Sequence, residues 1–82
     1  MGILIDVTRI AADEEVEAFT YGSPESEPGL MVVRLATGEV EQVVRSSGGM
    51  PDKHQFSRAK RVIQKRLEAG EALLDKMMWA AG

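Results

Sequence analysis

Apolar and polar residues alternate in short runs along the first half of the chain, and this period of two predicts β-strands. Residues with branched β-carbons or aromatic rings are frequent in these runs, as is typical of strands. The predicted strands cover residues 3–10, 15–21, 30–36 and 39–45. In the second, one face carries Val16, Ala18 and Thr20, and the other carries Glu17, Phe19 and Tyr21.

A helix over residues 8–19 is the alternative for the end of the first run and most of the second. The segment from Ala11 to Glu15 has good helix propensity, and Asp6 or Thr8 is placed to cap such a helix. The pattern alone leaves both interpretations open.

Glycine, proline and serine mark the connections between the runs. Thr37 and Gly38 separate the third and fourth runs and predict a tight hairpin turn, in which Gly38 adopts the positive φ that such turns require. Two polar segments, residues 22–29 and 46–49, predict loops before and after this hairpin.

After residue 51 the apolar period lengthens to three and four residues, which predicts a helix over residues 53–80. Asp52 is placed to cap its first turn, and Gln55 completes a capping-box pattern. Gly70 is a poor helix former, so a break there is the alternative. The apolar stripe consists of Phe56, Ala59, Ile63, Leu67, Gly70, Leu74, Met77 and Ala81.

These elements predict a single α+β domain over residues 1–82. Its architecture is an antiparallel four-stranded β-meander with one long C-terminal helix packed on one face, in the order ββββα. A helix over residues 8–19 would instead give βαββα. A chain of 82 residues buries one modest core.

Composition limits the kinds of stabilising site and the cellular location that we expect for this domain. The chain has no cysteine, so neither a disulfide framework nor a thiolate metal site is expected. It also lacks the layout of a signal peptide and any run of about 20 apolar residues, so we expect a cytoplasmic protein that does not enter a membrane.

Side chains suited to catalysis are sparse. His54 is the single histidine, and an enzyme needs a base with a nucleophile or a second acid beside it. An enzyme or anion-binding site around residues 48–54, from Gly48 to His54, is kept as an alternative, because backbone N–H groups of a glycine-rich loop can bind anions. We expect no enzymatic activity, no cofactor and no metal.

Charge divides the chain into an acidic half and a basic half. The net charge is −6 over residues 1–50 and +3 over residues 51–82. Arg58, Arg61 and Lys65 lie on one exposed helix face, and we expect the acidic strands to neutralise it. Nucleic-acid binding through this basic face is the alternative, although the chain has few aromatic residues to stack on bases.

The predicted helix is longer than the sheet and carries apolar residues on more than one side beyond Gly70. Leu73, Met77, Met78 and Trp79 therefore predict an interaction surface, and we expect a protein–protein interaction domain that forms a homodimer and serves as a regulator or adaptor. The alternative is that the chain breaks at Gly70 and its last segment folds back onto the core of the monomer.

Four short sequence words resemble a class of small uncharacterised bacterial proteins of similar length. The resemblance spans nearly the whole chain and implies a free-standing bacterial domain, without implying an activity or a functional residue. The words are Ile5-Asp6-Val7, Thr37-Gly38-Glu39-Val40-Glu41, Phe56-Ser57-Arg58-Ala59 and Trp79-Ala80.

Overall fold

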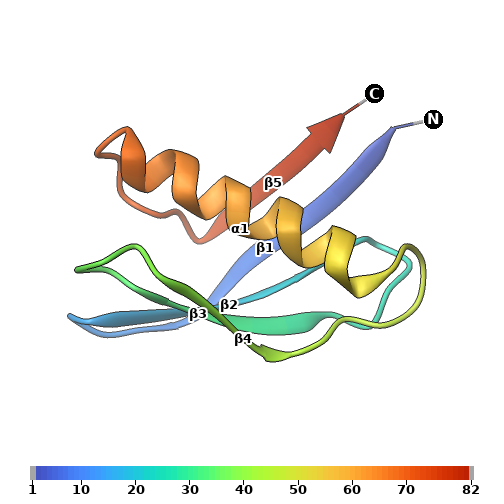
Figure 1. The fold of residues 1–82 in the computed structure, drawn as a ribbon, viewed down its shortest axis with the longest axis horizontal. Coiled ribbons are helices and arrows are strands. Elements are labelled where there is room, and N and C mark those ends of the chain that lie inside the picture. Colours follow the sequence, from blue (N-terminus) through green and yellow to red (C-terminus); the bar gives the residue numbers. More distant parts are fainter. Residues whose placement is uncertain (1, 82) are drawn as a thin grey trace.

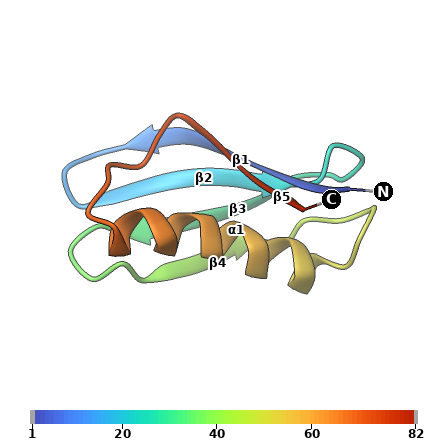
Figure 2. The ribbon, with the colours of Figure 1, turned by 90° about the horizontal axis from the view of Figure 1, so that it is seen from above.

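One antiparallel sheet and one helix make up the fold of residues 2–81, which the computed structural model describes. The sheet has the strand order β4-β3-β2-β1-β5. Helix α1 crosses one face of this sheet (Figures 1 and 2). In chain order the elements are β1 (Ile3–Ala12), β2 (Val16–Gly22), β3 (Gly29–Arg34), β4 (Val40–Val44), α1 (Asp52–Glu68) and β5 (Lys76–Ala81).

Alternate residues of each strand point toward α1 and form the core. Phe19 and Tyr21 are buried there, whereas Val16, Ala18 and Thr20 are only half-buried. The two faces predicted for the second strand are therefore confirmed. The core consists of Ile5, Val7, Phe19, Tyr21, Met31, Val33, Val40, Ala59, Ile63, Leu73 and Met77.

The alternative of a helix over residues 8–19 is wrong. β1 continues to Ala12 and pairs with β2, with an irregularity in register between Arg9 and Ala11. Asp13 then closes the turn, because its Oδ1 accepts hydrogen bonds from the backbone N–H groups of Glu15 and Val16, each at 2.8 Å. An aspartate side chain that binds the backbone two or three residues ahead favours a turn over a helix.

The hairpin predicted at Thr37 and Gly38 is confirmed. β3 pairs with β4, and Gly38 has a φ of 74°. The turn is wider than predicted, since β3 ends at Arg34 and β4 begins at Val40. The N–H of Arg34 donates to the carbonyl of Glu39 at 2.9 Å.

The helix predicted over residues 53–80 is wrong in its second half. α1 ends at Glu68, and Gly70 follows with a φ of 71°. The N–H of Gly70 donates to the carbonyl of Leu67 at 3.1 Å, and the N–H of Glu71 donates to the carbonyl of Arg66 at 2.9 Å. These two bonds form a Schellman motif, a common way to end a helix at glycine.

The residues after Gly70 fold back and complete the sheet, so the helix is not C-terminal. β5 pairs antiparallel with β1, from Thr8↔Lys76 to Ile3↔Ala81, and the two strands lie side by side in Figure 1. Met77 and Trp79 of β5 point inward at alternate positions, which is strand spacing, and Leu73 just before the strand also belongs to the core. The observed order is ββββαβ, with four strands and a helix as predicted and a fifth strand after them.

Candidate binding groove beside strand β5

β5 is an edge strand, and within residues 2–81 one side of its backbone pairs with no other strand. The N–H of Arg9 donates to the carbonyl of Asp75 at 2.8 Å, which makes Arg9 and Asp75 a hydrogen-bonded pair just before β5. Hydrogen-bonded pairs alternate along an antiparallel ladder. The register therefore directs the backbone groups of Met77 and Trp79 toward β1, and those of Lys76, Met78 and Ala80 away from the sheet.

The opposite edge, β4, is less suited to pairing. It has five residues, its register with β3 shifts between Leu30 and Met31, and Glu41 is exposed on it. Short length, bulges and charges are features that protect sheet edges. β5 has six residues in unbroken register with β1, and five of them are the apolar run Met77–Ala81.

A groove of about 490 Å³ separates β5 from α1. Its walls combine apolar side chains with cations, and Leu74 and Met78 are 47% and 60% exposed. The lining residues are Val62, Lys65 and Arg66 from α1, Leu74 from the connection, and Lys76, Met77, Met78, Trp79 and Ala80 from β5.

Arg58 packs against Trp79, one of the residues that line this groove. Its guanidinium carbon lies 5.0 Å from the centre of the Trp79 ring, within cation–π distance, and its Nη1 donates to the His54 carbonyl at 3.1 Å. Arg61 and Lys65 follow at successive turns of α1, and both are exposed. Of the three residues predicted as a basic face, Lys65 lines the groove and Arg58 packs on Trp79, whereas Arg61 is exposed outside the groove lining.

The acidic strands form no ion pair with these cations in the part of the chain that the structure describes, and their neutralisation by the strands stays a prediction. Among residues 2–81 the ion pairs join Arg9 to Glu17 and to Asp75, and Arg66 to Glu71 at 3.9 Å. None of them joins α1 to a strand. Arg61, Lys65 and Lys76 form no ion pair within the described chain, and the groove keeps a positive border.

The residues predicted as an interaction surface divide between core and groove. Leu73 and Met77 are buried in the core of the monomer, whereas Met78 and Trp79 are accessible from the groove. Sequence reasoning missed Val62, Arg66 and Lys76 as groove residues. They come together because β5 folds back beside α1. The alternative of a break at Gly70 with a fold-back onto the core is thus confirmed, but the pattern did not indicate that the returning segment pairs with β1 as a strand.

A polar network lies under the first turn of α1, where the capping box was expected. The structure has Pro51 at the cap position without a side-chain cap hydrogen bond, so the predicted role of Asp52 is wrong. Asp52 Oδ1 instead accepts from the Tyr21 hydroxyl at 2.7 Å and from the Ser46 N–H and hydroxyl at 2.8 and 2.9 Å. Oδ2 accepts from Gln42 Nε2 at 2.8 Å.

This network shifts the proton equilibria of its two titratable groups. Burial acts to raise the pKa of the Asp52 carboxyl group, but the hydrogen bonds from Tyr21, Gln42 and Ser46 outweigh it and hold the pKa below its ordinary value. Burial raises the pKa of the Tyr21 hydroxyl, and its hydrogen bond to the negative Asp52 adds to that effect. Tyr21 therefore stays a neutral donor to a charged carboxylate.

Gln55 ties the two loops together instead of capping the helix. It is fully buried, and its Oε1 accepts from the Ser23 N–H at 2.8 Å and the Ser26 hydroxyl at 3.1 Å. Its Nε2 donates to the carbonyls of Gly48 and Met50 at 3.1 and 2.7 Å. All four hydrogen-bonding positions of the side-chain amide are used, which makes this residue a structural link.

The segment from Gly48 to His54 is occupied by these structural contacts. Gly48 and Gly49 have positive φ, and the His54 side chain is exposed in the first turn of α1. Residues 2–81 contain no group of three or more histidine, aspartate or glutamate side chains placed to hold a metal ion. No helix in that range is long and apolar enough to cross a membrane.

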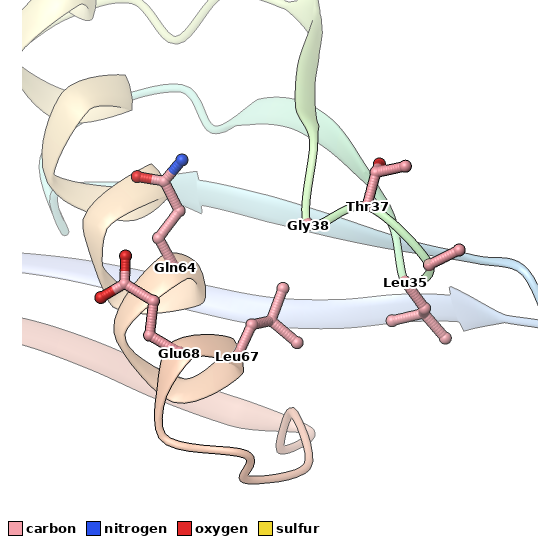
Figure 3. A pocket seen from close by; sticks show the side chains of 7 residues that line it. Leu35, Thr37, Gly38, Gln64, Leu67 and Glu68 are labelled. Atoms are coloured by element: carbon pink, nitrogen blue, oxygen red, sulfur yellow. The ribbon is translucent and has the colours of Figure 1, made fainter.

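A second hollow, of about 380 Å³, lies between the β3–β4 hairpin and the end of α1 (Figure 3). Leu35, Thr37 and Gly38 line it from the hairpin, and Gln64, Leu67 and Glu68 line it from the helix. Glu68 is its one titratable side chain. A single exposed carboxylate lacks the second acid or base that hydrolytic catalysis requires.

Comparison with protein-family models, with curated proteins and with solved structures found no match for this chain. The resemblance to small bacterial proteins therefore stays a prediction.

Proposed function

We propose that this chain is a protein–protein interaction domain that binds an extended segment of a partner protein as a sixth strand along β5. The observation that carries this proposal is the regular, unpaired edge of β5 beside a partly apolar groove. A sheet edge of this kind gives affinity through main-chain hydrogen bonds, and adjoining pockets select side chains.

The exposed edge offers bonds at three positions. Lys76, Met78 and Ala80 direct their N–H and C=O groups outward, and alternate side chains of an added strand would lie over Trp79 and Val62. Burial of Met78 and Leu74 under the partner would contribute about 25 cal/mol per Å² of apolar surface removed from water. Accessible apolar side chains beside an open strand edge support a binding surface.

A second copy of the chain fits this edge less well. Antiparallel pairing of β5 with its own copy requires a two-fold axis perpendicular to the sheet, which puts both α1 helices on the same face. Lys65 and Arg66 of each copy would then border the same seam, and like charges across an interface are unfavourable. Homodimerisation through Met78 and Trp79 is therefore the secondary form of the proposal.

Panning a phage library of random ten-residue peptides on the immobilised protein tests strand addition, with Met78→Pro as the variant for counter-selection. Proline removes the outward N–H of Met78 and is tolerated on edge strands, so the β1–β5 bonds remain. We expect enriched peptides that bind the wild-type protein and bind the variant at least tenfold more weakly.

Amide hydrogen exchange locates the bound peptide. In the free protein the Met78 and Ala80 amides should exchange quickly and those of Met77 and Trp79 slowly, and a bound peptide should slow the first pair. Peptides that bind the wild-type and Met78→Pro proteins equally, or that protect amides elsewhere, would contradict the proposal. A circular dichroism melt checks that the variant is folded.

Nucleic-acid binding is a second candidate, supported by one observation: Arg61 and Lys65 are exposed without ion pairs among residues 2–81. These cations would contact about two phosphates, so affinity should be weak and fall steeply with salt. Anisotropy with a labelled 20-nucleotide single strand measures it. Submicromolar binding that Arg61→Glu abolishes would favour this candidate over the peptide.

A further inference from the structure

We infer that the segment bound along β5 is acidic, with carboxylates on the side that faces α1; this inference rests on the proposed strand addition. In an antiparallel or parallel pair, side chains opposite each other lie on the same face of the sheet. Residues of the added strand opposite Met77 and Trp79 therefore face α1. Those opposite Met78 face the uncovered side of the sheet.

Two of the three α1 side chains that line the groove are cationic. They are Lys65 and Arg66, and Arg58 lies nearby on the Trp79 ring. Lys76 adds a cation on the other face at the start of β5, opposite Thr8. An incoming strand is thus bordered by positive charge on both faces.

Acidic groups of the chain leave this charge largely unneutralised. Asp75 is held by Arg9, whose Nη2 and Nε donate to its Oδ1 at 2.6 and 3.1 Å. Glu71 lies 3.9 Å from Arg66, at the limit of an ion pair, and both side chains are partly exposed. Within residues 2–81, Lys65 and Lys76 are left for a partner's carboxylates.

The same geometry distinguishes an acidic peptide from a nucleic acid and from a second copy of the chain. A nucleic-acid backbone offers phosphates to Lys65 and Arg61 but has no amide ladder for Met78 and Ala80. A second copy offers the ladder but brings its own cations. An extended acidic polypeptide supplies both, because its main chain pairs with β5 while its carboxylates meet the cations.

Three synthetic ten-residue peptides with blocked termini test the charge requirement. The first alternates valine and glutamate, the second has glutamine for every glutamate, and the third has lysine. Fluorescence anisotropy at 50 mM NaCl should show the glutamate peptide binding about tenfold more tightly than the glutamine peptide, and no binding of the lysine peptide. Raising the salt to 300 mM should weaken only the glutamate peptide, by several-fold.

A charge reversal of the groove residue Lys65, Lys65→Glu, locates the interaction on α1. It should weaken the glutamate peptide about tenfold and leave the glutamine peptide unchanged. Arg45→Glu is the matched control, since Arg45 is exposed beside the opposite edge strand. An equal loss in the control would mean that overall charge, and not this groove, attracts the peptide.

The outcomes separate this inference from the proposed function. Equal binding of the glutamate and glutamine peptides, with Met78 and Ala80 protected, would overturn the acidic partner and keep strand addition. If none of the three synthetic peptides binds, the sequences of the phage-selected peptides test the inference instead. Selected peptides without aspartate or glutamate would overturn it. No selected peptide at all would overturn both. A wild-type dimer that Met78→Pro turns into a monomer in light scattering would overturn the acidic partner in favour of the homodimeric form of the proposed function.

Discussion

Asp52 holds the start of α1 against the sheet through a carboxylate that only accepts hydrogen bonds. Its partners come from the second strand, the fourth strand and the loop that follows, and all four bonds lie between 2.7 and 2.9 Å. Each partner uses an N–H or O–H toward it. A carboxylate is the side chain of this size that satisfies four donors without offering a donor of its own.

Replacing Asp52 with asparagine should lower the free energy of unfolding by about 1–3 kcal/mol, because the amide NH₂ group faces groups that are themselves donors. Urea denaturation monitored by circular dichroism measures the change. Asp6→Asn is the matched control, since Asp6 is exposed and should change stability by less than about 0.5 kcal/mol. Equal effects of the two substitutions would mean that the Asp52 network does not stabilise the fold.

The lowered pKa of Asp52 also predicts how stability depends on pH. A carboxylate whose pKa is lower in the folded state contributes stability that is fully present above its unfolded pKa of about 3.9. That contribution is lost as the pH falls through the folded value. The unfolding free energy of the wild-type protein should therefore fall more steeply than that of Asp52→Asn below about pH 4. Parallel pH profiles from urea denaturation would contradict this.

At the scale of elements, two arginine side chains bind the backbone of the segment that connects Gly70 to β5. Arg66 Nε donates to the Ala72 carbonyl at 2.8 Å and Arg9 Nη1 donates to the Leu73 carbonyl at 3.1 Å, so both cations guide the chain back toward β1. Two neighbouring methionines then point in opposite directions. Met77 is 9% exposed and Met78 is 60% exposed.

This difference predicts unequal costs for two adjacent substitutions. Met77→Ala should destabilise the protein by about 2–3 kcal/mol, because it leaves a cavity in the core between the sheet and α1. Met78→Ala should change stability by less than about 0.5 kcal/mol. Thermal or urea denaturation compares them, with each variant as the control for the other. Equal losses would mean that this segment is not a strand with one buried face.

At the scale of the whole molecule, β1 lies between β2 and β5, so strands from the first and last parts of the described chain are neighbours in one sheet. It pairs with β2 on one side and with β5 on the other, so residues 3–8 contact residues 76–81. Ile5 and Val7 are fully buried beneath this arrangement, and Leu73 and Met77 belong to the same core. The last residues are therefore part of the folding unit.

A chain cut after Gly70 should fail to fold cooperatively. The cut removes Leu73, Met77 and Trp79, and each buried apolar side chain of this size contributes about 1.5–3 kcal/mol. Their sum is comparable with the stability of about 5–15 kcal/mol that is typical of whole domains. Circular dichroism melting of the cut and full-length chains compares them, and a sigmoidal transition in the cut chain would contradict this role for β5.

Local pattern was a good guide wherever neighbouring residues decide the outcome. The period of two around Phe19 and Tyr21 predicted the two faces of β2, and the Thr37-Gly38 pair predicted the hairpin with its positive φ. The start of α1 was predicted within a residue of Asp52. The local pattern assigns Asp52 and Gln55 to a helix cap. It does not indicate the groups they bind in the structure, because those groups lie in other strands and loops.

The sequence by itself determined the class of the fold, the four strands of the meander and the helix that follows them, because a period of two or of three to four residues states which side of an element is apolar. Only the tertiary structure decided the end of the chain. Met77 fits both a helical stripe with Leu74 and a strand face with Trp79, and the choice depends on the free edge of β1, to which β5 pairs. The groove exists because of that choice, since Lys65 of α1 and Met78 of β5 become neighbours only after the chain has turned back at Gly70.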